Sequence, residues 1–162
     1  MAVGSASWSF TEDDFAAITQ TLQRFLDDAN ARCALLVDRS GQLVATVGEQ
    51  PRFDSTAFAT LTAADFSAND QLAKLIGERD FNSLFHQGEK ESMYLADVAR
   101  RLILVVLFDS RTTLGLVRLK MKQTVEELTK MFEQVFSRPP QEAGGAPGLL
   151  AGADDEIDKL FQ

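Results

Sequence analysis

The chain alternates between segments whose apolar residues recur every three or four positions and segments whose apolar residues alternate or run together. Apolar residues from Phe15 to Leu26 follow a helical period, and the TEDD stretch from Thr11 is a helix start, so we expect a helix ending near Ala29. CALLVD and QLVATV, separated by RSG, predict a β-hairpin. Asp54 and Gly77 are placed to begin and end an alanine-rich helix.

The second half of the chain predicts three strands and a long helix. We expect a short edge strand at Leu84 to Glu89, followed by SMYLADVA, whose apolar positions alternate. RLILVVLFD is almost wholly apolar, which is typical of a central strand covered on both faces. Apolar residues from Leu114 to Val135 then advance by threes and fours, which predicts a helix capped by Thr113.

This order of elements, α-β-β-α-β-β-β-α, predicts an α+β fold of the α/β sandwich type. We expect a five-stranded, mainly antiparallel sheet between one central helix and the two terminal helices. The domain should span residues 10–136, after a loose N-terminus at 1–9. A Pro/Gly-rich linker at 137–153 and a short amphipathic acidic segment at 154–162 would form a flexible C-terminal tail.

The alanine-rich helix carries two candidate faces. The arc with more leucine, containing Leu61, Leu72 and Leu75, is expected to pack on the sheet, so the opposite arc should point outward. An exposed Phe among alanines often marks an interface, although alanines on an outer face also simply favour helix. The predicted partner-binding platform comprises Ala59, Ala63, Phe66, Ser67, Asp70, Gln71 and Lys74.

Composition narrows the possible partners and compartments. The formal net charge of -8, from 24 acidic and 16 basic side chains, argues against binding to nucleic acid or to an anionic membrane surface. The single cysteine excludes an internal disulfide framework and suits a reducing compartment. The first ten residues lack a signal-peptide pattern, and no apolar run is long enough to span a bilayer. We therefore expect a soluble, cytoplasmic protein.

The sequence contains no recognisable catalytic motif, so we do not expect an enzyme. Neither a P-loop nor a dinucleotide-binding glycine motif is present, and no cofactor is expected. With His86 and Cys33 as the sole histidine and cysteine, no metal site is expected within the chain. His86 is interpreted as an edge-strand residue with one hydrogen bond, Cys33 as a core residue, and Arg111 as a surface residue in a loop before a helix.

Several separated blocks together resemble the Roadblock (dynein light-chain type) domain family, and within it the bacterial MglB branch. The blocks are LVDRSGQLVAT, LTA…LAKLIGE, FHQGEKESMYL and LILVVLFDSRTTLGLVRLK, and the closing DDEIDKLF is similar as well. The resemblance covers about residues 10 to 136. The stretch LTAADFSANDQ is bulkier and more polar than the LTAGN pattern typical of the family, which would weaken partner docking or redirect it.

The resemblance implies a homodimer in which edge strands pair and the central helices lie side by side. MglB-type proteins dock a small Ras-like GTPase of the MglA type on those helices. They stimulate its GTP hydrolysis by positioning the GTPase's own catalytic residues, in bacterial cell polarity or motility. The alternative is a scaffold that binds a GTPase or another Roadblock protein without activating hydrolysis.

The C-terminal tail is expected to contribute a second contact. Ile157, Leu160 and Phe161 fall on one face of a short helical pattern that follows acidic residues. Such a helix is too short to be stable alone in water, so we expect it to order on the partner. The MglB resemblance implies that this segment contacts the GTPase away from the platform; a merely solubilising acidic end is the alternative.

Overall fold

The protein is a three-layered α/β sandwich in a computed structural model that describes residues 10–138. The sheet comprises β1 (Cys33–Asp38), β2 (Leu43–Gly48), β3 (Ser83–Gln87), β4 (Ser92–Val98) and β5 (Leu102–Phe108). Its strand order is β2-β1-β5-β4-β3, and every neighbouring pair is antiparallel. The predicted fold class and element order are confirmed.

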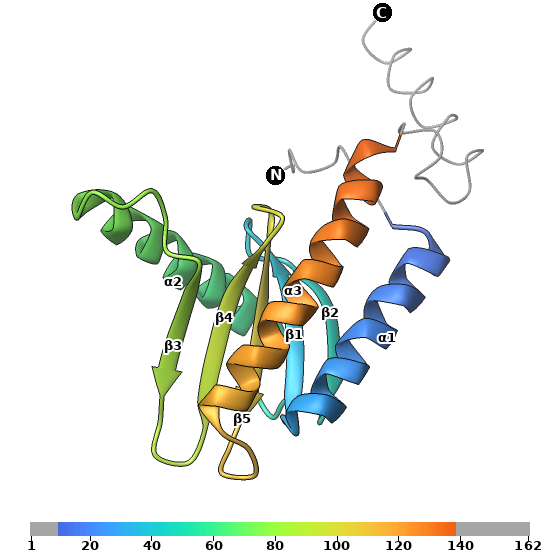
Figure 1. Cartoon of the computed structure of the whole chain (residues 1–162), viewed down its shortest axis with the longest axis horizontal. Helices are drawn as coiled ribbons and strands as arrows, with labels where there is room; N and C mark the ends of the chain where they lie inside the picture. Colours follow the sequence, from blue (N-terminus) through green and yellow to red (C-terminus); the bar gives the residue numbers. More distant parts are fainter. Residues whose placement is uncertain (1–9, 139–162) are drawn as a thin grey trace, which may run out of the picture.

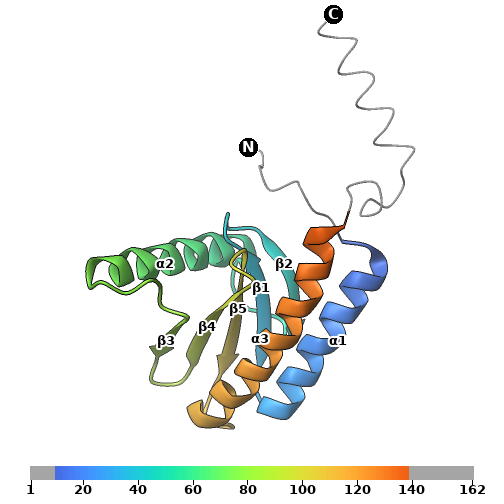
Figure 2. The same cartoon turned by 45° about the horizontal axis from the view of Figure 1, so that its top comes forward.

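The helices divide between the two faces of the sheet as expected. Figure 1 shows α1 (Glu12–Ala29) and α3 (Leu114–Ser137) side by side on one face, and α2 (Ser55–Leu75) on the other. Figure 2 shows α2 crossing the sheet and reaching past the β3 edge with its C-terminal end. The sheet therefore has one face covered by two helices and one face covered by a single helix.

Local sequence explains where each helix begins. In a capping box, the Thr11 hydroxyl accepts from the Asp14 N–H at 3.1 Å, and the Asp14 carboxylate accepts from the Thr11 N–H at 2.9 Å. The Asp54 carboxylate caps α2 by accepting from the N–H groups of residues 56 and 57. The Thr113 hydroxyl accepts from the N–H of Leu116 at the start of α3. All three starts agree with the sequence prediction.

The larger core lies between the sheet and the pair α1 and α3. It is built from the buried face of α1, alternate residues of the central strands, and the α3 stripe that includes Met121, Leu128 and Phe132. Phe10 meets Phe132 edge to face, with ring centroids 5.4 Å apart. At the far end of the helix pair, the Asp14 carboxylate accepts from Arg138, which ties the start of α1 to the end of α3.

The smaller core lies under α2. Leu35, Leu95, Ile103 and Val105 point from three central strands toward the buried Phe66 ring. One end of α2 is held against the turn between β1 and β2, where Gly41 adopts a φ of 99°. A Cβ at this glycine would sit 3.3 Å from the Thr60 Cα, so the small residue permits the close approach.

The predicted division of the chain into a domain, a linker and a tail stays a prediction. The described residues include the whole of the predicted domain at 10–136. The first nine residues, most of the predicted linker at 137–153 and the whole predicted tail at 154–162 lie outside the described residues.

Candidate functional site

The outward face of α2 is the most distinctive surface of the domain, and it is the opposite of the predicted one. The residues of α2 that are buried against the sheet are Ala59, Thr62, Ala63, Phe66, Asn69 and Ala73. The exposed residues include Leu61, Ala64, Ala68, Leu72 and Leu75, which recur at intervals of three, four and seven. We call these five residues the α2 stripe.

The inversion has a physical cause in side-chain size. Phe66 fills the space above the sheet, with none of its surface exposed. On either side of this ring, the small side chains of Ala59, Ala63 and Ala73 let the helix backbone lie close to the strands. The expectation that Ala59, Ala63 and Phe66 form an outward platform was therefore wrong. They hold α2 against the sheet.

The α2 stripe leaves large apolar side chains in solvent. Leu61 is 69% exposed, Leu72 56% and Leu75 82%, and Ile76 beyond the helix end is 69% exposed. A single exposed leucine is ordinary, but a continuous apolar row along one helix face is typical of a protein–protein contact surface.

The remaining predicted platform residues lie beside the stripe. Ser67, Gln71 and Lys74 are exposed on one flank of α2, and their role in partner binding stays a prediction. Asp70 is half-buried, because its carboxylate accepts from the Arg39 guanidinium at 2.7 Å. The tail residues Ile157, Leu160 and Phe161 lie outside the described residues.

The β3 strand forms a free edge of the sheet next to α2. It pairs with β4 on one side only, so along its other side its backbone groups have no strand partner among residues 10–138. The predicted edge strand is confirmed, with bounds Ser83–Gln87 instead of Leu84 to Glu89. An unpaired edge of this kind readily accepts a further strand.

One polar contact joins the free edge to α2. His86 Nε2 lies 2.5 Å from the Asp65 carboxylate, which connects β3 to the middle of the helix. This is the single hydrogen bond expected for His86. The contact also shows which flank of α2 points toward the β3 edge.

Arg39, in the turn between β1 and β2, organises the inner side of α2. Its guanidinium donates to Asp70 of α2 and to Asp97 of β4, and it lies 4.8 Å from the centroid of the Phe66 ring. Burial alone would lower the pKa of Arg39, but its hydrogen bonds to Asp97 and Asp70 raise the pKa overall. No sequence pattern indicated this cluster, since its members are far apart along the chain.

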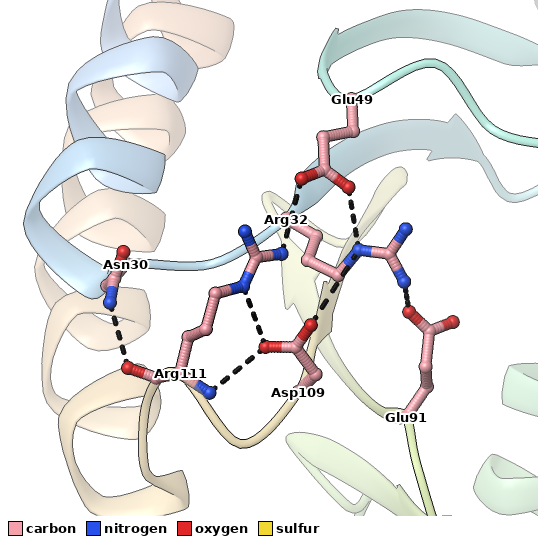
Figure 3. Close-up of polar contacts among 6 residues, drawn as sticks. All are labelled: Asn30, Arg32, Glu49, Glu91, Asp109 and Arg111. Atoms are coloured by element: carbon pink, nitrogen blue, oxygen red, sulfur yellow. Dashed lines mark hydrogen bonds and ion pairs between the residues drawn. The ribbon is translucent and has the colours of Figure 1, made fainter.

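A second charged cluster lies at the ends of β1, β2 and β5 (Figure 3). Arg111 donates to Asp109 at 3.0 Å and to Glu49 at 3.2 Å, and Arg32 donates to Glu49 at 2.7 Å. The bonds from Arg32 and Arg111 lower the pKa of Glu49. Asn30, at the end of α1, donates to the backbone carbonyl of Arg111 at 2.8 Å. Arg111 is therefore held in surface ion pairs, as its interpretation as a surface residue expects.

Within residues 10–138, no group of three or more His, Cys, Asp or Glu side chains could hold a metal ion. Cys33 is 3% exposed, and burial raises the pKa of its thiol to about 11, so it is a core residue as expected. No helix in this part of the chain is long and apolar enough to cross a membrane.

Comparison with known proteins agrees with this geometry. The family profile of the Roadblock/LC7 domain matches residues 17–108, and the chain belongs to that family. Within it, the chain falls in the MglB branch. It is 48% identical to Myxococcus xanthus MglB, over 74% of this chain and 98% of that one, with a TM-score of 0.71.

Two further proteins are similar to this chain at lower sequence identity. The gliding protein MglB from Thermus thermophilus is 32% identical over 79% of this chain and 97% of its own, with a TM-score of 0.73. An uncharacterised protein of Methanocaldococcus jannaschii is 29% identical over 100 residues, which are 61% of this chain and 85% of that protein.

Proposed function

We propose that this protein is a homodimeric regulator that binds a small Ras-like GTPase of the MglA type and stimulates its GTP hydrolysis. The observation that carries the proposal is the exposed α2 stripe beside the free β3 edge, on a chain of the MglB branch. Both features are surfaces that a partner would cover. We assign the chemistry to the partner, because the sequence contains no recognisable catalytic motif.

The dimer is proposed to form through β3. Pairing of two β3 edges would satisfy the backbone groups that the single chain leaves unpaired, and it would continue the sheet across both copies. Asp65 points to the β3 edge through its bond to His86. At 100° per residue, Leu61 and Leu72 lie within about 40° of Asp65 around the helix. Those two leucines would therefore face α2 of the second copy.

The GTPase is proposed to dock on the outward side of the paired α2 helices. Ala64 and Leu75 lie there, and the flank away from the β3 edge carries Ser67, Gln71 and Lys74. Small and polar side chains over an apolar row offer a flat surface that a second protein can approach closely. The dimer would act by holding the GTPase's own catalytic residues in place, since no arginine finger is assigned to it.

The tail is proposed to add a contact away from this platform, through Ile157, Leu160 and Phe161. We further propose that the protein works in the bacterial cytoplasm, in cell polarity or motility, and that partners concentrate it at a cell pole. The support is the MglB likeness together with the net charge of -8, which disfavours nucleic acid and anionic membrane as alternatives.

A scaffold that binds the GTPase without altering hydrolysis is the second candidate, favoured by the exposed Gln71 in a stretch that is more polar than the LTAGN pattern typical of the family. Binding and GTP turnover should be measured together, with the Ras-like GTPase encoded in the same genome. Binding with faster turnover supports the activator. Binding with unchanged turnover would establish the scaffold, and absence of binding would overturn both.

A further inference from the structure

A groove of about 830 Å³ runs along α3 and is lined mainly by residues of α3 and β4. Its floor includes Tyr94 and Ala96 of β4, and its wall includes Val125 and Phe136 of α3. The opposite flank of α3 contacts α1, where Glu127 pairs with Arg24. The groove has the volume of sites that bury a ligand or a peptide segment.

Three cations that line this groove make no ion pair within residues 10–138: Arg100 in the turn after β4, and Arg118 and Lys122 on α3. Arg118 and Lys122 lie one helical turn apart. Other arginines of the domain, such as Arg24 and Arg32, are paired. Glu126 follows one turn further along α3 and also lines the groove. Glu133 lies two turns beyond Glu126 and lines the groove as well, so the charges along the α3 wall are positive at Arg118 and Lys122 and negative at Glu126 and Glu133.

The chain leaves the domain at one end of the same groove. Phe136 lines the groove and lies in the last turn of α3, so the residues beyond Ser137 begin there. Residues 138–153 reach up to about 50 Å when extended, at roughly 3.3 Å per residue. The return from Phe136 to Arg118, at the far end of the groove, is only about 27 Å along α3. The tail at 154–162 can therefore reach any part of the groove.

We propose that residues 154–161 dock into the α3 groove of their own chain. Ile157, Leu160 and Phe161 share one helical face and would cover the apolar floor, in the way that amphipathic helices occupy hydrophobic grooves. Lying parallel to α3, the acidic residues 154–156 would meet Arg118 and Lys122, and Lys159 would meet Glu126. The tail and the groove thus match in apolar surface and in the order of their charges.

This inference does not rest on the proposed function, because it concerns the free protein. It supplies an ordered site for the tail in the absence of any partner, whereas the sequence suggested that the tail orders only on the GTPase. The three apolar side chains cannot occupy the groove and a partner at once. A partner that uses the tail would have to displace it from the groove, which would lower the apparent affinity for that partner.

The test places a nitroxide spin label on Gln162→Cys in the full-length chain. Cys33 is buried and its thiol has a raised pKa of about 11, so labelling is directed to the new thiol. In the free protein, the amide NMR signals of Ala96, Val125 and Thr129 should lose intensity. Those of Ser67 and Gln71 on α2 should keep theirs.

Matched variants separate docking from random collision. Leu160→Asp should restore the groove signals, and Lys122→Glu should restore them in part. Lys130→Glu makes the same charge change on the same helix outside the groove, so it should leave the signal loss intact. If the groove amide signals kept their intensity in the labelled chain with an otherwise unchanged tail, the proposal would be overturned. It would also be overturned if the Leu160→Asp variant lost as much groove signal as that chain. Either failure would leave the GTPase proposal standing.

Discussion

At the residue scale, the position of α2 depends on Phe66 and Arg39. The Phe66 ring is fully buried over the sheet, and the Arg39 guanidinium covers it while bonding to Asp70 and Asp97. A cation above an aromatic face is favourable, and the two carboxylates satisfy its charge. Together they fix the helix whose outer face forms the candidate site.

Phe66→Ala should lower the free energy of unfolding by about 3–5 kcal/mol, because it removes a buried ring and leaves a cavity under α2. Urea unfolding at a fixed chain concentration measures this loss. Phe15→Ala is the matched control, since Phe15 is 48% exposed and should cost only about 1 kcal/mol. Equal losses for the two variants would contradict the burial of Phe66 described here.

Asp14 gives the fold a pH-dependent contribution. Hydrogen bonds from Arg138 and Thr11 lower its pKa from 3.8 to about 2, and burial opposes them. Because the pKa of Asp14 is lower in the folded than in the unfolded state, its ionised carboxylate stabilises the fold by about 2 kcal/mol. This stabilisation is present above about pH 4 and is lost as the pH falls toward 2. Asp14→Asn should therefore destabilise the protein at pH 7 by about this amount in urea unfolding. The difference from wild type should shrink toward pH 2; a constant difference across that range would count against the ion pair.

At the scale of elements, caps and periodicity predicted most of the fold. Thr11, Asp54 and Thr113 mark helix starts that depend only on neighbouring residues. The apolar run of β5 predicted a central strand, because a strand covered on both faces carries few polar side chains. These signals are local, so a single sequence is enough to read them.

The orientation of α2 could not be predicted in the same way. Its sequence has two apolar arcs, one rich in leucine and one containing Phe66, and helical periodicity does not say which arc meets the sheet. Leucine usually lies inside, but here Phe66 and the small alanines meet the sheet and the leucine arc is exposed in the single chain. The Arg39 cluster was missed for a related reason, since Asp70 and Asp97 come near only through folding.

Ser67→Arg should abolish GTPase docking and leave the domain folded, because the side chain is exposed beside the α2 stripe. Gln123→Arg on the outer surface of α3 is the matched control and should bind as wild type. Titration with the fluorescently labelled GTPase measures both affinities. Ala63→Arg is unsuitable for this purpose, since Ala63 is buried and its substitution tests folding. Normal binding by Ser67→Arg would place the platform elsewhere.

At the scale of the whole molecule, the free β3 edge and the α2 stripe lie next to each other, so a single partner surface could contact both. In the proposed dimer, a second copy of the chain would cover the β3 edge together with Leu61 and Leu72 of the stripe, because its own edge and stripe are arranged in the same way.

Light scattering at micromolar concentration should accordingly give twice the chain mass of 17.8 kDa. The double variant Leu61→Asp with Leu72→Asp should give the single-chain mass, because it sets like charges where the two α2 helices are proposed to meet. Phe15→Asp introduces a similar charge at an exposed aromatic residue of α1 and should remain dimeric. A wild-type mass of 17.8 kDa would contradict the dimer.

The central claim is that a dimer of this chain speeds a reaction whose catalytic groups belong to its partner. Single-turnover GTP hydrolysis by the Ras-like GTPase, measured while this protein is titrated in, tests that claim most directly. The account predicts that the rate constant rises and reaches a plateau at two chains per GTPase, and that Ser67→Arg leaves it at the unstimulated value. A bound complex that hydrolyses GTP no faster than the GTPase alone would contradict it.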